Sequence, residues 1–335
     1  MPFLVDSEQL EQQLRALIDT FVQNIKKTAV HHFLWLNGMY VLTALLGVAL
    51  IASLTVWVSP LFTALTLSTF LLSFVAGYIL RRYIHLHKAD DYILLVEQFG
   101  LSCHQALENK FPKEEFHATL GLAYAIFSDC LQDIEYNFFS PKFLPKSLTS
   151  LAENISCFFF QHDLFLAREV LLQASLSEYL QLVKTDPINL TYHSQLANGY
   201  VLLSRLYKNP QEENQEEERR WIDRRIYTEE ISKKYRRATE RAIEEFKIIS
   251  SYAPDDPWVL AQLALSYKDL KLPLEEIHTC EALLRLSPSD RETLHRLGTL
   301  YFQLGANAKG LEVYRQLCHI DCAIAASLIT YYGSH

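Results

Sequence analysis

The sequence predicts an all-α protein in which an N-terminal two-helix transmembrane hairpin precedes an α-solenoid. The first observation is that no Asp, Glu, Lys or Arg occurs from Thr28 to Leu80, whereas the chain after Arg81 has an ordinary soluble composition. The second observation is a repeated spacing. Pro187, Pro254 and Pro288 are each followed by Leu at the ninth position, Ala or Gly at the tenth and Tyr at the thirteenth. A fixed period of this kind predicts stacked helix pairs.

Residues 1–31 are predicted to form an amphipathic helix on the cytosolic side of the membrane. Apolar residues recur there at three- and four-residue spacing: Leu10, Leu14, Leu17, Phe21 and Ile25. They form one apolar stripe on a helix. The stripe can pack on the rest of the protein, lie on the membrane surface or pair with a partner helix. Packing on the protein is favoured, because a membrane-surface helix would carry more Lys and Arg on its polar face.

Residues 32–80 are predicted to form the transmembrane hairpin, with spans at about 33–58 and 61–80. About 20 apolar residues in a helix cross a hydrocarbon core, and both segments reach that length without a charge. Only Ser59 and Pro60 separate them, so the two spans must run antiparallel. A buried helix pair of a soluble protein and a one-sided re-entrant hairpin are the alternatives.

The flanks of the hairpin predict its orientation. Cations collect on the cytoplasmic side of a membrane, and the hairpin has Lys26 and Lys27 before it and Arg81 and Arg82 after it. Both termini are therefore predicted to be cytoplasmic. Small residues recur every four residues on the second span, at Thr69, Ser73 and Gly77. This spacing lets two helices approach closely, so a homo-oligomer through the membrane helices is a further expectation.

The chain after the hairpin is predicted to be helical to its end, since no strand-like alternation appears. Residues 81–112 form a juxtamembrane helix in this prediction, and residues 113–186 form degenerate helical repeats. The second segment contains Leu120, Gly121 and Tyr124, which is the Leu-Gly-x-x-Tyr pattern of the later repeats.

Residues 187–335 are predicted to form the solenoid itself, split by a charged insertion at about 208–228. The two clearest units run from about Asp256 to Asp290 and from about Arg291 to Ile324. Residues 323–333 are predicted to be a C-terminal capping helix, which covers the last apolar face of a solenoid. The units resemble the tetratricopeptide repeat (TPR), a 34-residue helix-turn-helix. The resemblance implies a scaffold that binds other proteins along a groove.

Three positions depart from the TPR pattern. Glu276 stands where the family prefers a small residue at the helix crossing, Cys280 replaces an aromatic residue, and Cys322 occupies the closing Pro position. The small residues Ala264 and Gly298 are predicted to let the paired helices come close.

Partner contacts are predicted on the inner faces of the first helices of the units. The candidates form a polar, weakly charged set: Gln195, Asn198, Gln262, Lys268, His295, Arg296 and Thr299. The insertion adds Trp221, which either contacts a partner from a projecting helix or is tucked into the solenoid. The second alternative is favoured, because large aromatic side chains are mostly buried. For the other candidates, ordinary solvated surface is the alternative.

No motif for catalysis, a cofactor or a metal is present. The chain has no Gly-rich phosphate loop, His-Glu-x-x-His or Gly-x-Ser-x-Gly. His31, His32, His85 and His87 lie at the predicted membrane edge, but no carboxylate or Cys completes a metal set there. The six cysteines are expected to be reduced core thiols. A net charge of −8 with scattered cations predicts no nucleic-acid partner.

The predicted function is a membrane-anchored protein–protein interaction scaffold or adaptor in the bacterial inner membrane. Its partners would be other proteins, through the solenoid groove, and the lipid bilayer, through residues 33–80. The alternative is a secreted bacterial effector that binds host proteins, because the paired apolar segment is similar to the bilobed segment of chlamydial inclusion-membrane proteins. That alternative would place the protein in the inclusion membrane.

Overall fold

The computed structural model describes residues 8–55, 60–107, 112–138, 146–210 and 225–333. Within these ranges the secondary structure is helical and contains no strand, which confirms the predicted all-α class. The chain divides into two compact units. Unit 1 comprises Met1–Glu178 and Pro210–Thr228, and unit 2 comprises Tyr179–Asn209 and Glu229–His335.

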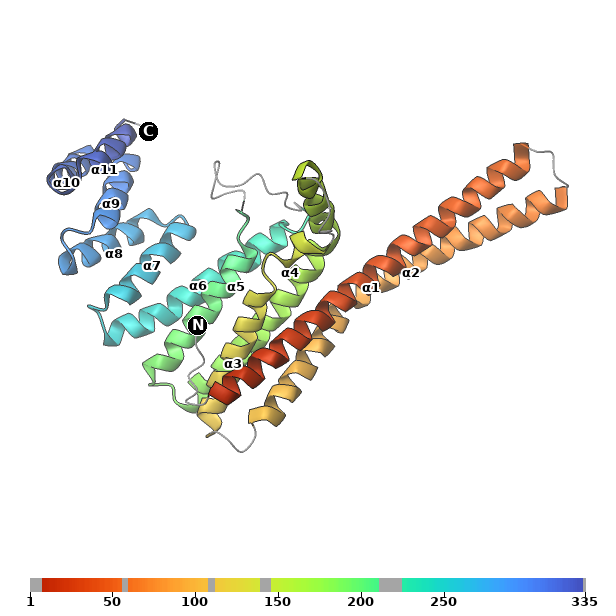
Figure 1. Cartoon of the computed structure of the whole chain (residues 1–335). Helices are drawn as coiled ribbons and strands as arrows, with labels where there is room; N and C mark the ends of the chain where they lie inside the picture. The colour runs from red at the N-terminus through yellow and green to blue at the C-terminus, as the bar shows by residue number, and fades with distance from the viewer. Residues whose placement is uncertain (1–7, 56–59, 108–111, 139–145, 211–224, 334–335) are drawn as a thin grey trace. The chain divides into compact units, whose positions relative to one another are not determined.

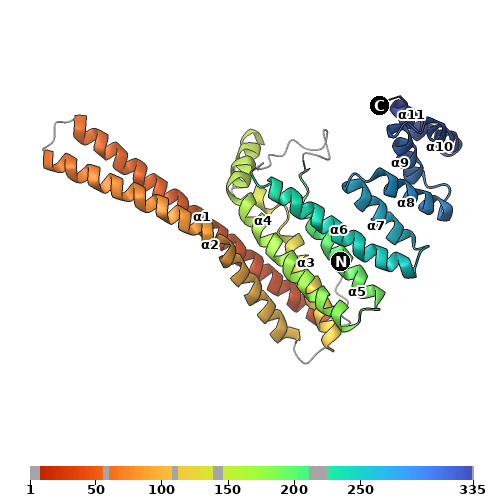
Figure 2. The same cartoon turned by 180° about the vertical axis from the view of Figure 1, so that it is seen from behind.

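Two long antiparallel helices dominate unit 1. α1 spans Glu8–Thr55 and α2 spans Pro60–Leu107. Pro60 begins α2, where its missing N–H costs no helical hydrogen bond. Figures 1 and 2 show the two helices side by side, with their connected ends extending away from the rest of the unit. The predicted amphipathic helix, the spans and the juxtamembrane helix are therefore not separate helices, because α1 and α2 each run through the predicted boundaries unbroken.

Unit 1 contains three further elements among its described residues. α3 spans Lys113–Cys130, the 3-10 helix η1 spans Ile134–Asn137 and α4, most of which belongs to this unit, spans Lys146–Thr185. α3 has 18 residues and α4 has 40. The segment predicted as degenerate repeats therefore lacks, in its described part, the equal helix pair of a TPR unit.

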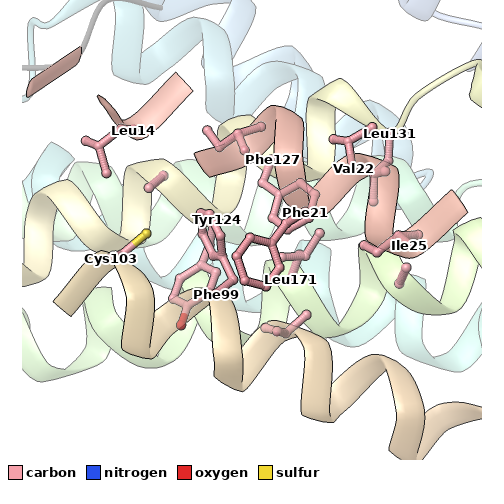
Figure 3. Packing of buried hydrophobic residues seen from close by; sticks show 14 of the residues in the cluster. Leu14, Phe21, Val22, Ile25, Phe99, Cys103, Tyr124, Phe127, Leu131 and Leu171 are labelled. Carbon is pink, nitrogen blue, oxygen red and sulfur yellow. The ribbon is translucent and has the colours of Figure 1, made fainter. Parts of the chain in front are cut away.

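The core of unit 1 lies where the unconnected halves of α1 and α2 meet α3 and α4. Phe99 has no exposed surface, and its ring centroid lies 5.4 Å from that of Phe21, 5.5 Å from that of Tyr124 and 4.9 Å from that of Phe127. Figure 3 shows these rings packed with residues of all four helices. The apolar stripe of residues 1–31 contributes Phe21 to this core, so it packs on the protein.

Unit 2 consists of successive helix pairs. The pairs are α5 (Leu190–Tyr207) with α6 (Glu229–Tyr252), α7 (Pro257–Asp269) with α8 (Pro273–Leu286), and α9 (Arg291–Gln303) with α10 (Asn307–Ile320). α9 and α10 begin 34 residues after α7 and α8, which is the predicted period. Unit 2 is thus a TPR-like α-solenoid. The charged insertion separates α5 from α6, but most of it lies outside the described residues.

Side-chain caps explain where several of these helices begin. The Asp256 carboxylate accepts hydrogen bonds from the backbone N–H groups of Trp258 and Val259 at the start of α7. Asn189 caps α5 in the same way through Thr191. Each cap satisfies backbone donors that the first helical turn leaves without a partner.

The solenoid ends in a short helix, α11 (Cys322–Leu328), followed by the 3-10 helix η3 (Ile329–Tyr331). Leu328 has no exposed surface and packs in one core with α9 and α10. Gly298 on α9 makes room for it, because a Cβ at Gly298 would lie 2.6 Å from Leu328 Cδ2. Gly298 therefore admits the terminal helix α11, whereas the sequence predicted an approach between the paired helices.

Candidate functional site

The connected ends of α1 and α2 expose an uncharged, apolar surface. Leu61, Leu72 and Val48 are 82, 72 and 65 % exposed. Both helices are long and apolar enough to cross a membrane, by length and composition. The uncharged part of α2, residues 60–80, rises about 31 Å at 1.5 Å per residue. That length matches a hydrocarbon core of about 30 Å.

The uncharged part of α1, which begins at Thr28, lies in two different environments. Ala29 is fully buried and His32 is 6 % exposed, and the Phe33 ring lies 4.8 Å from that of Phe159 on α4. The start of the run therefore lies partly in unit 1's interior, where Ala29 and His32 are buried, whereas His31 is exposed. From Leu34 onward most side chains of α1 are exposed or half-buried, as in a surface that faces lipid.

The small residues that predicted an oligomer serve, in part, the contact between α1 and α2. A Cβ added to Gly77 would lie 3.7 Å from Met39 Cε, so Gly77 faces the other helix of the same hairpin. The Thr69 hydroxyl donates to the carbonyl of Thr66 on its own helix. A homo-oligomer through these helices stays a prediction.

A network of charged side chains lies at the foot of the hairpin, where α1 and α2 meet α4. His32 Nε2 lies 2.9 Å from Asp91 Oδ2, and Lys88 binds Asp163, whose side chain is 2 % exposed. His32, considered in the sequence for a metal site, is thus a partner of carboxylates. The described residues contain no group of His, Cys, Asp and Glu that could hold a metal ion.

The predicted partner-contact residues on α5 and α7 remain accessible. Asn198 and Lys268 are exposed, and Gln195 and Gln262 are half-buried. Gln195 Oε1 is buried and has no hydrogen-bond partner among the described residues.

The predicted residues on α9 are occupied within the protein. Arg296 forms two hydrogen bonds with Glu276 on α8. His295 Nε2 lies 3.0 Å from the hydroxyl of Ser327 on α11. Thr299 is 5 % exposed and donates to the His295 carbonyl, so little of its side chain is accessible to a partner. α9 differs from α7 because α11 covers it.

Sequence reasoning missed two apolar members of the accessible surface. Trp258 and Leu265 on α7 are 42 and 51 % exposed, and they flank Gln262 at helical spacing. The signal was present in the sequence, since these three residues share one face of a helix. We define the α5–α7 face as the accessible residues Gln195, Asn198, Leu202, Trp258, Gln262, Leu265 and Lys268. Trp221 lies outside the described residues.

Ion pairs within unit 2 fix the helices that carry this face. Lys208 Nζ, after α5, lies 2.9 Å from Asp269 Oδ1 at the end of α7. The buried His193 on α5 lies 2.6 Å from Glu245 on α6 and 2.9 Å from the Pro187 carbonyl. Burial lowers the pKa of His193, but the hydrogen bonds to Glu245 and Pro187 outweigh it and raise the pKa above its ordinary value.

The six cysteines differ in their burial. All six are free, as expected, but only Cys103, Cys157 and Cys280 are buried, so the prediction of core thiols holds for these three. Burial raises the pKa of the Cys103 and Cys280 thiols to about 12. They are therefore protonated near neutral pH and are poor nucleophiles.

No protein-family model and no curated protein matches the chain. Among solved structures, the chain is similar to the MamA RS-1 ArsTM double mutant, with 10 % identity and a TM-score of 0.33 over 70 % of this chain and 96 % of that one. It is also similar to a thermophilic TPR protein in Thermus thermophilus, with 18 % identity and a TM-score of 0.30 over 55 % and 93 % of the two chains. At these scores neither similarity indicates a function.

Proposed function

We propose that the protein is a membrane-anchored adaptor. The hairpin of α1 and α2 inserts into a bilayer with both termini on the cytoplasmic side, and the α5–α7 face of the solenoid binds another protein. The bacterial inner membrane and the alternative of a secreted effector stay predictions from the sequence.

The observation that carries the proposal is the exposed, uncharged half of the hairpin. A soluble protein rarely exposes a contiguous apolar patch larger than a few hundred Å². Here the exposed apolar side chains continue along α1 and α2 for the length of a membrane span. Insertion into lipid removes this surface from water, and the helices satisfy their own backbone hydrogen bonds there.

The α5–α7 face supports a protein partner. It combines an exposed Trp258 and Leu265 with the amide side chains of Gln195, Asn198 and Gln262. Aromatic and apolar anchors surrounded by polar groups are typical of protein interfaces. Anchoring would confine this face to two dimensions and raise its effective concentration near membrane partners.

The membrane part is tested by alkaline extraction of membranes that contain the full-length chain. We expect the wild-type protein to stay in the membrane and to be released only by detergent. Leu72→Arg, in the exposed half of the hairpin, should release a large share of the protein, because an arginine at the centre of a span costs about 2.5–3.5 kcal/mol on insertion scales.

Leu101→Arg is the matched control. Leu101 is also on α2 and is 66 % exposed, close to the 72 % of Leu72, but it lies beyond the uncharged stretch. The control should stay in the membrane. Release of the wild-type protein by alkali alone would contradict the proposed anchor. Release of the two variants to the same extent would contradict it as well.

A further inference from the structure

A cavity of about 580 Å³ opens at the foot of the hairpin. Its lining comes from α1, α2 and α4 together with Arg225, all within unit 1. Ligand cavities of a few hundred Å³ accommodate small molecules and headgroups.

Cations outnumber carboxylates in this lining. Among the described residues that line the cavity, Arg81, Lys88 and Arg225 are cations and Asp163 is a carboxylate. Lys88 is bound to Asp163, which neutralises both. Arg81 donates to the uncharged phenol of Tyr40, so its charge is not neutralised by that contact. The described lining therefore keeps a positive charge at Arg81, which favours an anion in the cavity.

The position of Arg81 along α2 sets the depth of the cavity. Arg81 is the first charged residue after the uncharged residues 60–80. In a membrane-inserted hairpin it therefore lies at the level of the lipid headgroups. Trp35 and Tyr78 lie beside it around a neighbouring cavity, and aromatic residues of this kind collect at membrane interfaces.

That neighbouring cavity is apolar and adjoins the first. It measures about 270 Å³, shares Tyr40 and Arg81 with the larger cavity, and is otherwise lined mainly by apolar and aromatic side chains of α1 and α2, such as Met39, Phe74 and Leu80. A polar cavity next to an apolar one matches a molecule with an anionic head and a hydrocarbon tail. A free phosphate would use only the first.

An exposed apolar stripe on α4 extends from the same cavity. Phe158 and Phe159 line the cavity and are 44 and 36 % exposed. Ile155 and Leu151 continue the stripe at helical spacing and are exposed as well. Arg225 lies 4.7 Å above the Phe158 ring. An amphipathic helix of this kind places its apolar face at the boundary between headgroups and acyl chains.

We infer that the cavity binds the phosphate-bearing headgroup of an anionic membrane phospholipid. Arg81 and Arg225 contact the phosphate, and the apolar cavity takes the beginning of an acyl chain. A charge-assisted contact between guanidinium and phosphate is stronger than a neutral hydrogen bond. This inference rests on the proposed membrane anchor, and it gives the anchor a preference for anionic lipid.

The test uses the full-length protein purified in mild detergent and titrated with phosphatidylglycerol, phosphatidylcholine or glycerol 3-phosphate, with bound molecules counted by native mass spectrometry. We expect phosphatidylglycerol to bind more tightly than the other two. Arg81→Gln should weaken its binding about tenfold, which is the loss of one charge-assisted contact. Arg82→Gln removes the same charge from the next residue, which is exposed and does not line the cavity, and should keep wild-type affinity.

Three results would overturn the inference. These are equal weakening by Arg81→Gln and Arg82→Gln, wild-type affinity of Arg81→Gln, and binding of glycerol 3-phosphate as tight as that of phosphatidylglycerol, which would show a site for soluble phosphates. Alkaline extraction of the same variants separates this failure from that of the anchor. Variants that stay in the membrane but bind lipid equally well contradict only the lipid site.

Discussion

Arg296 on α9 binds Glu276 on α8 through two parallel hydrogen bonds, with Nε 2.5 Å from Oε1 and Nη2 2.9 Å from Oε2. Glu276 is 2 % exposed and stands where the TPR pattern has a small residue. The departure in one unit is therefore compensated by a cation from the next. Because a buried carboxylate is costly without a partner, the pair couples two successive helix pairs.

Arg296→Ala should lower the free energy of unfolding of unit 2 by about 2 kcal/mol. This is less than the cost of breaking a fully buried pair, because the Arg296 side chain is 33 % exposed. Adding Glu276→Ala should recover part of the loss, since it removes the stranded carboxylate. Denaturant unfolding, followed by Trp258 fluorescence in a chain with Phe at the other three tryptophans, measures both. A double variant no more stable than Arg296→Ala would contradict the pairing.

Gly310→Ala should destabilise unit 2 by about 1–3 kcal/mol. A Cβ at Gly310 on α10 would lie 2.5 Å from Cε1 of Phe302 on α9, and Phe302 has no exposed surface, so its ring has no space to move. The higher helix propensity of Ala offsets only part of the strain. Gln316→Ala, at an exposed position of α10, should change stability by less than about 0.5 kcal/mol. Equal effects would contradict the tight fit.

His193 should make the stability of unit 2 depend on pH. Its pKa is raised in the folded protein, whereas an unperturbed histidine has a pKa of about 6.5. Its contribution is therefore fully present below that value and is lost as the pH rises through the folded pKa. His193→Gln should be most destabilising at acidic pH and approach a constant difference from wild type at alkaline pH. Unfolding curves of the wild type and of this variant at several pH values check this, and a difference that stays constant across the pH range would contradict it.

The sequence predicted the helices and their period better than it predicted the polar contacts. The spacing after Pro254 and Pro288 marks which helix faces are apolar, and burial of those faces drives the pairing of helices. The partners of Glu276 could not be read in the same way, because exposed and buried charged residues look alike in a sequence. Glu276 stands at a position where the TPR pattern has a small residue, so the sequence shows a departure there. Only the structure shows that Arg296 forms hydrogen bonds with its carboxylate.

The contact face shows the same limit. Seven polar candidates followed from the inner positions of the first helices, yet the three on α9 make contacts within the protein. His295 contacts Ser327 on α11, Arg296 binds Glu276 on α8, and Thr299 is buried and donates to the carbonyl of His295. The terminal helix α11 packs on α9, whereas the equivalent positions on α7, such as Gln262 and Leu265, remain accessible to solvent. Trp258 and Leu265 were missed because the TPR pattern directs attention to its own core positions.

Leu265→Asp should weaken binding of a protein partner more than about tenfold, since exposed apolar anchors near the centre of an interface carry much of its binding energy. Leu274→Asp on α8 is the control, because Leu274 is 62 % exposed but does not belong to the α5–α7 face. Partners are captured on the detergent-solubilised full-length protein and quantified by mass spectrometry. Proteins retained equally by the two variants would place the contact elsewhere.

Lys271 and Gly305 occupy equivalent turns between the helices of successive pairs, 34 residues apart. Both have the left-handed backbone conformation, with φ of 56° and 74°. This conformation costs a residue with a Cβ about 1 kcal/mol or more, and glycine adopts it freely. Gly305→Ala should therefore destabilise unit 2 by about 1 kcal/mol. Lys271→Gly should stabilise it, although by less, because glycine also gains entropy in the unfolded chain. In the Trp258 assay, the unfolding midpoint should fall for Gly305→Ala and rise for Lys271→Gly. A lower midpoint for Lys271→Gly would contradict the second prediction, because the lysine side chain would then stabilise unit 2 by more than its backbone strain costs.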